Sequence, residues 1–452
     1  AWRRSANSHR ALRTISTTPS PWFFSPTRWP RRIWRPRTAF HPSWWNGFVY
    51  DGLDDHVFAL ATYDGGLVAG GWFDRAGETN ARRVARWGGS SWSALGTGLD
   101  GPVYALAVQD GALFAGGEFT SAGGENAANI ALWDGAGWAP VGSGLDGPVD
   151  ALAEHAGALI AAGEFANAGE TPVARIARWD GTSWSALGDG MDAGVYALLS
   201  DGGDLFAGGD FDRAGAITAH RVAAWDGDSW RALGSGAAGS IRTLASYDGG
   251  VVAGGVFSTI DGVPARNLAI WNGAAWSVLG AGVDGPVAAL AVLDGVLIAG
   301  GDFREADGFA ANNVAYWNGR YWSPMGSGTT DKVKAFATSV DGLYVGGWFA
   351  RLGDSSRCIR SAVPFALESG CVWSHNGRGS RSFGGGENRM NSSGLVACRG
   401  LGRCRLGCAR ARIHGRSGNN AGGCDGADLV SGLPLRGRQI SSGRWRCMAW
   451  KL

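Results

Sequence analysis

Residues 103–148 read VYALAVQDGALFAGGEFTSAGGENAANIALWDGAGWAPVGSGLDGP, and this 46-residue unit recurs along the chain. One phenylalanine recurs every 46 residues. In six of its seven copies it is preceded by Gly-Gly and one further residue, and in the remaining copy Ala162-Gly163 replaces the two glycines. Self-similarity at such a period is the signature of repeat architectures. The aromatic residues that keep the step are Phe73, Phe119, Phe165, Phe211, Phe257, Phe303 and Phe349; Trp87, Trp133, Trp179, Trp225, Trp271 and Trp317; and Trp92, Trp138, Trp184, Trp230, Trp276 and Trp322.

Each unit reads as four short strands, at 103–108, 112–117, 130–133 and 138–141 in this copy. In the first of them Val103, Ala105 and Ala107 are expected on one face, and Tyr104, Leu106 and Val108 on the other, since strand side chains alternate. Asp-Gly pairs at 110–111 and 134–135 supply tight turns. The unit therefore predicts four antiparallel strands.

A four-stranded antiparallel unit of this length is typical of one β-propeller blade. The bulky tryptophans favour a propeller over the alternative, a β-solenoid, whose rungs rely on aliphatic ladders. We expect an all-β fold, a propeller of seven blades. Six units are complete, and residues 332–349 would pair with residues 45–54 to form a split seventh, which removes free sheet edges.

Charge and composition divide the chain into three segments. Glycine provides 76 of 452 residues, and the net charge is +2. Residues 1–50 carry nine arginines and no acid, residues 51–350 carry 15 basic and 34 acidic side chains, and all seven cysteines follow residue 357. We expect the propeller at 45–352. The basic Arg/Trp/Pro-rich segment 1–44 and the Gly/Arg/Cys-rich tail 353–452 are expected to be disordered or read out of frame.

The repeat resembles a kelch-type blade. The residues that carry the resemblance are the paired glycines after strand two, the Trp133-Asp134-Gly135 turn, Trp138, and the Gly142-Ser143-Gly144-Leu145 linker. The pattern is also similar to repeats of bacterial secreted propeller proteins and to the propeller of the fungal cortical polarity-marker family. The resemblance covers about two thirds of the chain and implies a secreted or cell-surface module.

Recognisable catalytic and metal motifs are missing from the repeat region. Kelch-like copper oxidases need tyrosine, histidine and a cysteine, whereas residues 51–350 have no cysteine and only His56, His155 and His220. No Asp-x-Asp-x-Asp-Gly run is found, and Asp-Gly already suits hairpin turns. We therefore expect no catalytic, cofactor-binding or metal residue and no cofactor, with calcium at the Asp-Gly loops left open.

Two sets of loop residues are candidates for other roles. An acid follows the paired glycines in four units, and arginine or asparagine precedes strand three; we expect charge-assisted pairs that pin the loop, at Glu118 with Asn129, Glu164 with Arg175, Asp210 with Arg221, and Asp302 with Asn313. Trp72 and Trp348 replace the acid in units that closure would make neighbours. This break in symmetry makes Trp72 and Trp348 the candidate ligand-binding residues.

The expected function is a non-catalytic protein- or glycan-binding or structural module, secreted or at the cell surface. The alternative is a glycan-active enzyme, a hydrolase or lyase with a pair of carboxylates. The acidic repeat region argues against a nucleic-acid partner, because it repels phosphate. No apolar run is long enough for a membrane helix. We expect a monomer with a protein or carbohydrate ligand.

Overall fold

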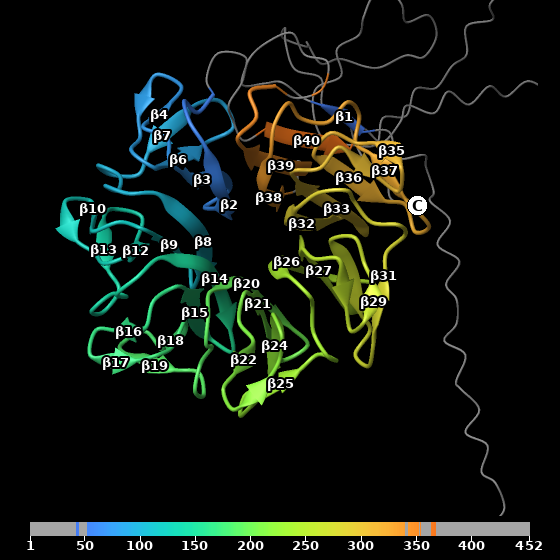
Figure 1. The fold of residues 1–452 in the computed structure, drawn as a ribbon. Coiled ribbons are helices and arrows are strands. Elements are labelled where there is room, and N and C mark those ends of the chain that lie inside the picture. The colour runs from blue at the N-terminus through green and yellow to red at the C-terminus, as the bar shows by residue number, and fades with distance from the viewer. Residues whose placement is uncertain (1–41, 45–51, 340–341, 352, 354–362, 368–452) are drawn as a thin grey trace, which may run out of the picture. The chain divides into compact units, whose positions relative to one another are not determined.

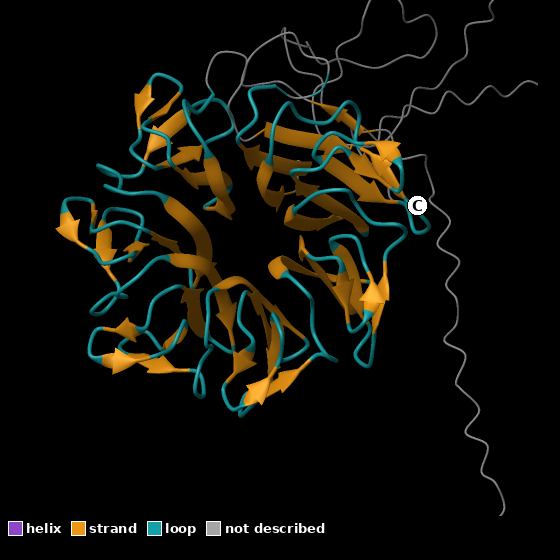
Figure 2. Ribbon diagram, in the orientation of Figure 1, coloured by secondary structure: helices purple, strands orange, loops and turns teal. Residues whose placement is uncertain are grey.

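The structure is a computed structural model that describes residues 42–44, 52–339, 342–351, 353 and 363–367. All of these lie in the unit Phe40–Leu452. Its strands form sheets placed around a common axis (Figure 1). Within the described ranges every regular element is a β-strand, as Figure 2 shows. The all-β propeller prediction is confirmed, and the β-solenoid alternative is wrong.

Six antiparallel sheets, named here blades 1 to 6, each contain four strands ordered from the axis outward. The strands are β2 (Val57–Tyr63), β3 (Gly66–Gly71), β6 (Val84–Trp87) and β7 (Trp92–Ala94) in blade 1; β8 (Val103–Gln109), β9 (Ala112–Gly117), β12 (Ile130–Trp133) and β13 (Trp138–Pro140) in blade 2; β14 (Val149–His155), β15 (Ala158–Gly163), β18 (Ile176–Trp179) and β19 (Trp184–Ala186) in blade 3; β20 (Val195–Asp201), β21 (Asp204–Gly209), β24 (Val222–Trp225) and β25 (Trp230–Ala232) in blade 4; β26 (Ser240–Tyr247), β27 (Gly250–Val256), β30 (Leu268–Trp271) and β31 (Trp276–Val278) in blade 5; and β32 (Val287–Leu293), β33 (Val296–Gly301), β36 (Val314–Trp317) and β37 (Trp322–Pro324) in blade 6.

The loop between the second and third strands of each blade carries a short hairpin, whose two strands have two residues each. The hairpin strands are β4 (Arg75–Ala76) and β5 (Thr79–Asn80); β10 (Ser121–Ala122) and β11 (Glu125–Asn126); β16 (Asn167–Ala168) and β17 (Thr171–Pro172); β22 (Arg213–Ala214) and β23 (Ile217–Thr218); β28 (Thr259–Ile260) and β29 (Val263–Pro264); and β34 (Glu305–Ala306) and β35 (Phe309–Ala310).

A partial sheet stands between blade 6 and blade 1. It contains β38 (Val333–Ser339) and β39 (Gly342–Gly347), and β39 pairs with β40 (Val363–Leu367), which in turn pairs with β1 (Pro42–Trp44). Both outer strands lie outside the predicted range 45–352. Residues 45–51 of the predicted half-blade, and nearly all of segments 1–44 and 353–452, lie outside the described residues. A complete seventh blade remains a prediction.

Each innermost strand contains a β-bulge at the same place. In blade 2 the register jumps from Val103 opposite Gly117 to Ala105 opposite Gly116, so Tyr104 has no partner. The predicted alternation is therefore wrong across the bulge. Val103 and Leu106 both approach Gly70 of blade 1, where an added Cβ would lie 2.6 Å and 3.4 Å from their side chains. The extra residue turns the strand, and it frees one side chain from the packing between blades.

Glycine near the end of the second strand allows close contact between blades in six of the seven sheets, and Ala162 takes this place in blade 3. A Cβ on Gly116 would lie 2.5 Å from Cγ1 of Val149 in blade 3, which is closer than atoms can approach. Glycine removes the obstacle and lets the two backbones pack closely. The same contact joins the partial sheet to blade 1, since a Cβ on Gly346 would lie 2.7 Å from Val57. The ring of inner strands is thus continuous from β38 to β2.

The outer tryptophans join successive blades by hydrogen bonds. Nε1 of Trp138 in blade 2 donates to the Leu95 carbonyl, which follows blade 1, at 2.9 Å. Trp184, Trp230, Trp276 and Trp322 repeat this bond with the linker before their own blade, at 2.8–3.1 Å. All four are buried. Burying indole with its N–H satisfied is favourable, so this series forms part of the core between blades.

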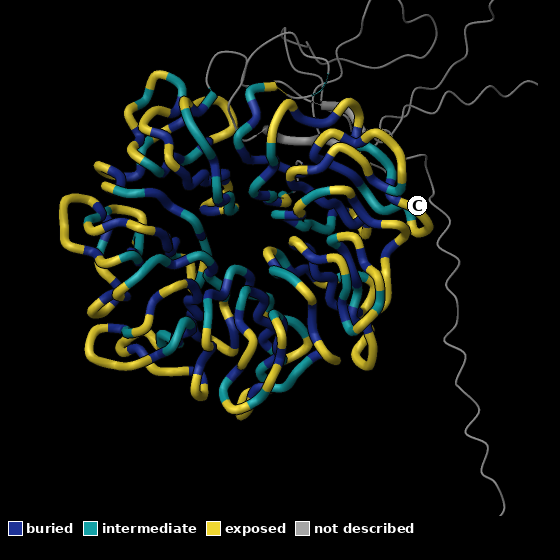
Figure 3. Tube along the Cα trace, viewed as in Figure 1, coloured by how far each residue is buried: buried dark blue, intermediate teal, exposed yellow. Residues whose placement is uncertain are grey.

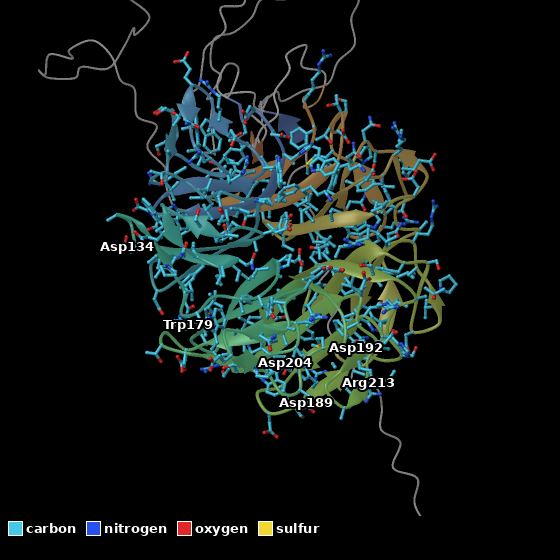
Figure 4. All side chains as sticks on the ribbon, turned by 60° about the vertical axis from the view of Figure 1, so that its left-hand side comes forward. Asp134, Trp179, Asp189, Asp192, Asp204 and Arg213 are labelled. Carbon is cyan, nitrogen blue, oxygen red and sulfur yellow. The ribbon has the colours of Figure 1, made fainter. Side chains whose placement is uncertain are left out.

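In five of the six blades an aspartate attaches the preceding linker to the hairpin loop, whereas the linker before blade 5 has Ala238 at this position. Oδ1 of Asp192 accepts hydrogen bonds from the backbone N–H groups of Asp212 and Arg213, at 2.9 and 3.0 Å. Figure 4 shows Asp192 beside Arg213. Asp54, Asp100, Asp146 and Asp284 form the same pair of bonds in other units. These carboxylates fix the loop face of the propeller.

Burial follows the radial arrangement. Buried residues occupy the middle of the strands, and exposed ones gather at the turns (Figure 3). One buried cluster combines Leu67, Phe73 and Val57 of blade 1 with Leu343 of the partial sheet and Phe349, which follows that sheet's second strand. Blade 1 therefore packs against the partial sheet on one face and against blade 2 on the other. In the part of the chain that the structure describes, no helix has the length and hydropathy to cross a membrane.

Trp322→Ala tests the packing between blades. Trp322 is 0% exposed and its indole bonds to Leu279, so we expect a loss of ~3–5 kcal/mol in the free energy of unfolding from the cavity left behind. The neighbouring Tyr321, 45% exposed, is the control, and Tyr321→Ala should change stability by less than about 1 kcal/mol. Urea unfolding measures both. Similar losses in the two variants would contradict the packing described.

Candidate functional site

The bulged residues of the seven innermost strands form the candidate site, named here the axial cluster. Their flanking positions are nearly constant: valine or isoleucine on one side, alanine or threonine on the other. The bulged position itself changes chemistry from sheet to sheet. Its members are Phe58, Tyr104, Asp150, Tyr196, Arg242, Ala288 and Lys334. The residue type at the bulge therefore breaks the symmetry of the repeat, at one end of the inner ring of strands.

A second ring of residues stands beside the axial cluster, directly after the second strand in six sheets and at the last residue of that strand, Val256, in blade 5. Their backbone N–H groups donate to the carbonyl just before the innermost strand, for example Glu118 to Pro102 at 3.0 Å and Trp348 to Lys332 at 2.9 Å. This bond places each side chain next to a bulge. These rim residues are Trp72, Glu118, Glu164, Asp210, Val256, Asp302 and Trp348.

Carboxylates and tyrosines gather over blades 2 to 4. The Tyr104 hydroxyl donates to Oε2 of Glu118 at 3.1 Å. The Tyr196 hydroxyl lies 3.3 Å from Oε1 of Glu164 and 3.2 Å from Oδ2 of Asp210, and therefore links two blades. Burial, followed by the Glu118 bond, raises the pKa of Tyr104 to about 12. Both hydroxyls therefore stay protonated as donors. We name Glu118, Asp150, Glu164 and Asp210 the acidic arc.

Asp150 has the most perturbed carboxyl of the acidic arc. Burial is the main cause, and the negative charge of Glu164 adds to it, so that the pKa of Asp150 is raised to about 6. The positive charge of Arg242 acts in the opposite direction. A carboxyl with a pKa near 6 can hold or release a proton close to neutral pH.

Cations and an aromatic ring gather on the other side of the axial cluster. Nζ of Lys332 forms an ion pair with Asp302 at 2.9 Å. The ammonium groups of Lys332 and Lys334 lie 5.2 and 5.3 Å from the ring centre of Trp348. Burial and then the positive charges of Arg242 and Lys332 lower the pKa of Lys334. We name Arg242, Lys332 and Lys334 the basic arc.

Arg242 shows that the two arcs converge on the axis. It comes from blade 5, yet its charge acts on Asp150 of blade 3 and on Lys334 of the partial sheet, neither of which is adjacent to blade 5. Its guanidinium stacks 4.8 Å from the ring centre of Tyr196. Side chains from non-adjacent sheets can interact in this way only where the inner ends of the blades meet.

Trp72 and Trp348 lie on the same rim and share a neighbour. The His56 carbonyl accepts from the Trp72 backbone N–H at 2.9 Å, and the His56 ring lies 4.4 Å from the Trp348 ring. Trp72 is 46% exposed, with the Arg83 guanidinium 5.1 Å from its ring centre, whereas Trp348 is half-buried. The two residues come from neighbouring sheets, as predicted. Their role in binding remains a prediction.

The four predicted loop pairs have a different geometry. Arg175 donates to the Phe165 carbonyl, Arg221 to the Asp210 carbonyl and to the Asp212 carboxylate, Asn129 to the Leu145 carbonyl, and Asn313 to the Thr329 carbonyl. The acids are contacted by Tyr104, Tyr196 and Lys332 instead. Within the described chain the two side chains of each pair thus have separate partners. The guanidinium or amide holds the loop, and the acid faces the axial cluster.

One cavity borders these residues. It has a volume of about 370 Å³ and is lined by Asp302, Asn313, Thr330 and Asp331 among others, between blade 6 and the partial sheet. A second, of about 330 Å³, is lined by residues further along β2, β8 and β38, including Leu60, Leu106 and Phe336. No cluster of three or more histidine, cysteine or acidic side chains suited to a metal ion occurs among the residues described.

Sequence reasoning missed the axial cluster, although its signal is in the sequence. Comparing the units column by column shows one position that varies between two that do not, at residue 104 and its equivalents. The period-two alternation assigned Tyr104 to the same packed face as Leu106, because a bulge leaves no mark in that pattern. The rim position drew attention through its four acids, as members of loop pairs, and through Trp72 and Trp348, as candidate ligand-binding residues.

Comparisons with known proteins bear on the architecture. No family model matches the chain, and no curated protein matches it. The crystal structure of the computationally designed Ika8 protein is similar over 70% of this chain and 97% of that one, with 16% identity and a TM-score of 0.44. The WD40 β-propeller domain of Doa1 is similar over 68% of this chain and 94% of that domain, with 15% identity and a TM-score of 0.47. The extracellular domain of the putative hybrid two-component system BT4673 from B. thetaiotaomicron is similar over 72% of this chain and 40% of that one, with 9% identity and a TM-score of 0.47.

Asp150→Asn tests the electrostatics of the site. The folded state binds the Asp150 proton more tightly than the unfolded state, because the pKa is about 6 against an ordinary 3.8. This group's contribution to stability therefore grows as pH falls from about 6 to about 4, and its charge is unfavourable above pH 6. The asparagine variant should be more stable at pH 7, by up to about 3 kcal/mol, and should lose this pH dependence.

The matched control is Asp134→Asn. Asp134 lies in an exposed turn, where backbone N–H groups of Gly137 and Ala136 lower its pKa. Its contribution to stability is complete above its ordinary pKa and is lost only as pH falls below that value, so the slope between pH 4 and 6 should not change. Thermal unfolding across pH measures both variants. A slope that survives in Asp150→Asn would overturn the assignment to this carboxyl.

Proposed function

We propose that the chain is a kelch-like, non-catalytic binding module, secreted or displayed at a cell surface, whose axial cluster and rim contact a protein or glycan ligand. The observation that carries the proposal is the axial cluster itself. Aromatic, hydroxyl, acidic and basic side chains occupy one position whose neighbours hardly vary. A position needed only for packing would keep one residue type, as the adjacent valine does. The location rests on the resemblance of the repeat.

The rim supports contact with a large ligand. Trp72 and Val256 are exposed on it, and large exposed apolar side chains beside charged ones are typical of recognition surfaces. Tyrosine and tryptophan supply flat apolar area at little cost in side-chain entropy, and both stack well on sugar rings and apolar groups. The loop aspartates and the packing between blades hold these residues on rigid strands.

A glycan-active enzyme is the second candidate, and Asp150 is the observation that favours it. A carboxyl with a pKa near 6 is suited to donate a proton to a leaving group, and the negative charge of the Glu164 carboxylate acts on it. In this case the same cluster would turn over the glycan that it binds.

Arrays of glycans and of surface peptides, probed with the full chain, test the binding function. Trp72→Ala should reduce the signal at least 10-fold, because truncating an aromatic anchor commonly removes more than about 1.4 kcal/mol of binding free energy. Phe309→Ala is the matched control, since Phe309 is 52% exposed but lies on an outer hairpin. Equal effects of the two substitutions, or no ligand on either array, would overturn the proposal.

Product analysis of the array ligands separates the two candidates. A binding module leaves them intact, whereas an enzyme cleaves them and loses at least 100-fold in rate with Asp150→Asn, the usual contribution of a positioned acid. Cleavage by the wild-type chain that Asp150→Asn abolishes would establish the enzyme and end the non-catalytic assignment.

A further inference from the structure

Cations at the end of the propeller that carries the axial cluster lie over aromatic rings, with a carboxylate close by. Lys332 is the clearest case, since its ammonium lies 5.2 Å from the ring centre of Trp348 and 2.9 Å from Asp302. Two further sets have the same three components, namely Arg83 with Trp72 and Asp74, and Arg242 with Tyr196 and Asp210. The combination of cation, aromatic ring and carboxylate therefore recurs within this fold.

One aromatic pair at the same end has a carboxylate but lacks a cation. Phe58 and Tyr104 come from the neighbouring inner strands β2 and β8 (Figure 1), and their ring centres lie 5.5 Å apart with the ring planes inclined at 67°. The Tyr104 hydroxyl donates to Oε2 of Glu118 at 3.1 Å. Among the residues that the structure describes, no cation lies over either ring and none pairs with Glu118. We name Phe58, Tyr104 and Glu118 the open corner.

The basic groups nearest the open corner already have partners of their own. The ammonium of Lys334, on the adjoining partial sheet, lies over the Trp348 ring, and the guanidinium of Arg242 lies over the Tyr196 ring. The His56 ring centre is 6.3 Å from that of Phe58, and Nδ1 of His56 pairs with a carboxylate oxygen of Asp55 at 2.9 Å. The positive charge that the other sets contain is therefore not supplied to the open corner by these three groups.

Negative charge surrounds the open corner. Glu118 and Glu164 are exposed, and neither forms an ion pair with a cation of the described chain. Burial and then the Glu118 carboxylate raise the pKa of Tyr104, and the negative charge of Asp150 adds to this effect. Residues 51–350 carry 15 basic and 34 acidic side chains, so the surface around the corner attracts a basic partner at long range.

A lysine side chain has the shape and the charge that the open corner lacks. Its stem of four methylenes can pack on the half-buried Phe58 ring, while its ammonium reaches the Tyr104 ring and Glu118. One oxygen of Glu118 already accepts from Tyr104, and a single point charge suits such a carboxylate better than the fork of arginine, which matches two free oxygens. The amine of an amino sugar has no stem, so it cannot pass the rim to half-buried rings.

We propose, on the basis of the binding function above, that the open corner receives a lysine side chain from a basic segment of a partner protein. The ammonium lies on the Tyr104 ring beside Glu118, and the stem follows Phe58. The exposed Trp72, which belongs to the same blade as Phe58, contacts an adjacent residue of the segment. The contact that Lys332 makes within the chain is thus repeated between two proteins.

Fluorescence anisotropy of labelled, end-capped peptides with the full chain tests the inference. One probe is a Gly-Ser peptide that carries three lysines, and the other is the same peptide with each lysine acetylated, which keeps the stem and removes the charge. The lysine peptide should bind about 10- to 100-fold more tightly, the range expected for a charge-assisted hydrogen bond. Glu118→Gln and Phe58→Leu should each remove most of that preference. Glu125→Gln, which removes the same charge from the outer hairpin of blade 2, is the matched control and should keep it.

The outcomes separate this inference from the proposed function. Equal binding of the two peptides, or binding of neither, overturns the lysine assignment, while the arrays still decide whether the axial cluster binds a ligand. Equal losses in Glu118→Gln and Glu125→Gln would show a general attraction to acidic surface and would also overturn it. So would tighter binding of a glucosamine trimer, or of the peptide with arginines in place of lysines. Thermal unfolding verifies folding, and because Glu118 is exposed, Glu118→Gln decides the question if Phe58→Leu does not fold.

Discussion

A four-stranded blade can cover its two faces only with other blades, and the rest of the structure follows from this constraint. A twisted sheet with no second layer must pack against a neighbour on each side. The close approach of Gly116 to Val149 and the indole bond of Trp138 to Leu95 show how each unit meets the next. Because every boundary is built alike, the residues that form it repeat with the unit. Positions whose residue type does not repeat take no part in this packing.

The β-bulge removes one side chain of each innermost strand from the packing between blades. Without it, Tyr104 would point into the packed space between blades, where the geometry accepts a small set of side chains. With one extra residue in the strand, Val103 and Leu106 both pack toward blade 1 and Tyr104 turns toward the axis. The same device in all seven innermost strands presents seven independent side chains on a fixed frame. Chemistry can therefore vary at these positions at little risk to the fold.

The sequence made the architecture predictable because packing between blades is encoded in every copy of the repeat. Phase, strand count and the core role of Trp184 could all be read from residue type and spacing. The axial cluster could not, because a bulge shifts register without changing composition. The side chains of the predicted loop pairs have separate partners for a related reason. Asn313 and its equivalents adopt positive φ, which directs their amide or guanidinium groups to carbonyls of the loop, while the acids point to the axis.

Closure shows where repeat logic stops being sufficient. The sequence placed the completing half-blade at residues 45–54, of which 45–51 lie outside the described residues, and in it Leu53-Asp54 resembles Leu99-Asp100. Both pairs do behave alike, since Leu53 bridges to Ala76 and Leu99 to Ala122, each as the linker that enters a blade. A linker is not a strand, and the strand that pairs with β40 is β1, ahead of it. Likeness between units therefore fixes the role of a segment within the repeat, whereas the partner of a sheet edge depends on which backbone can reach it.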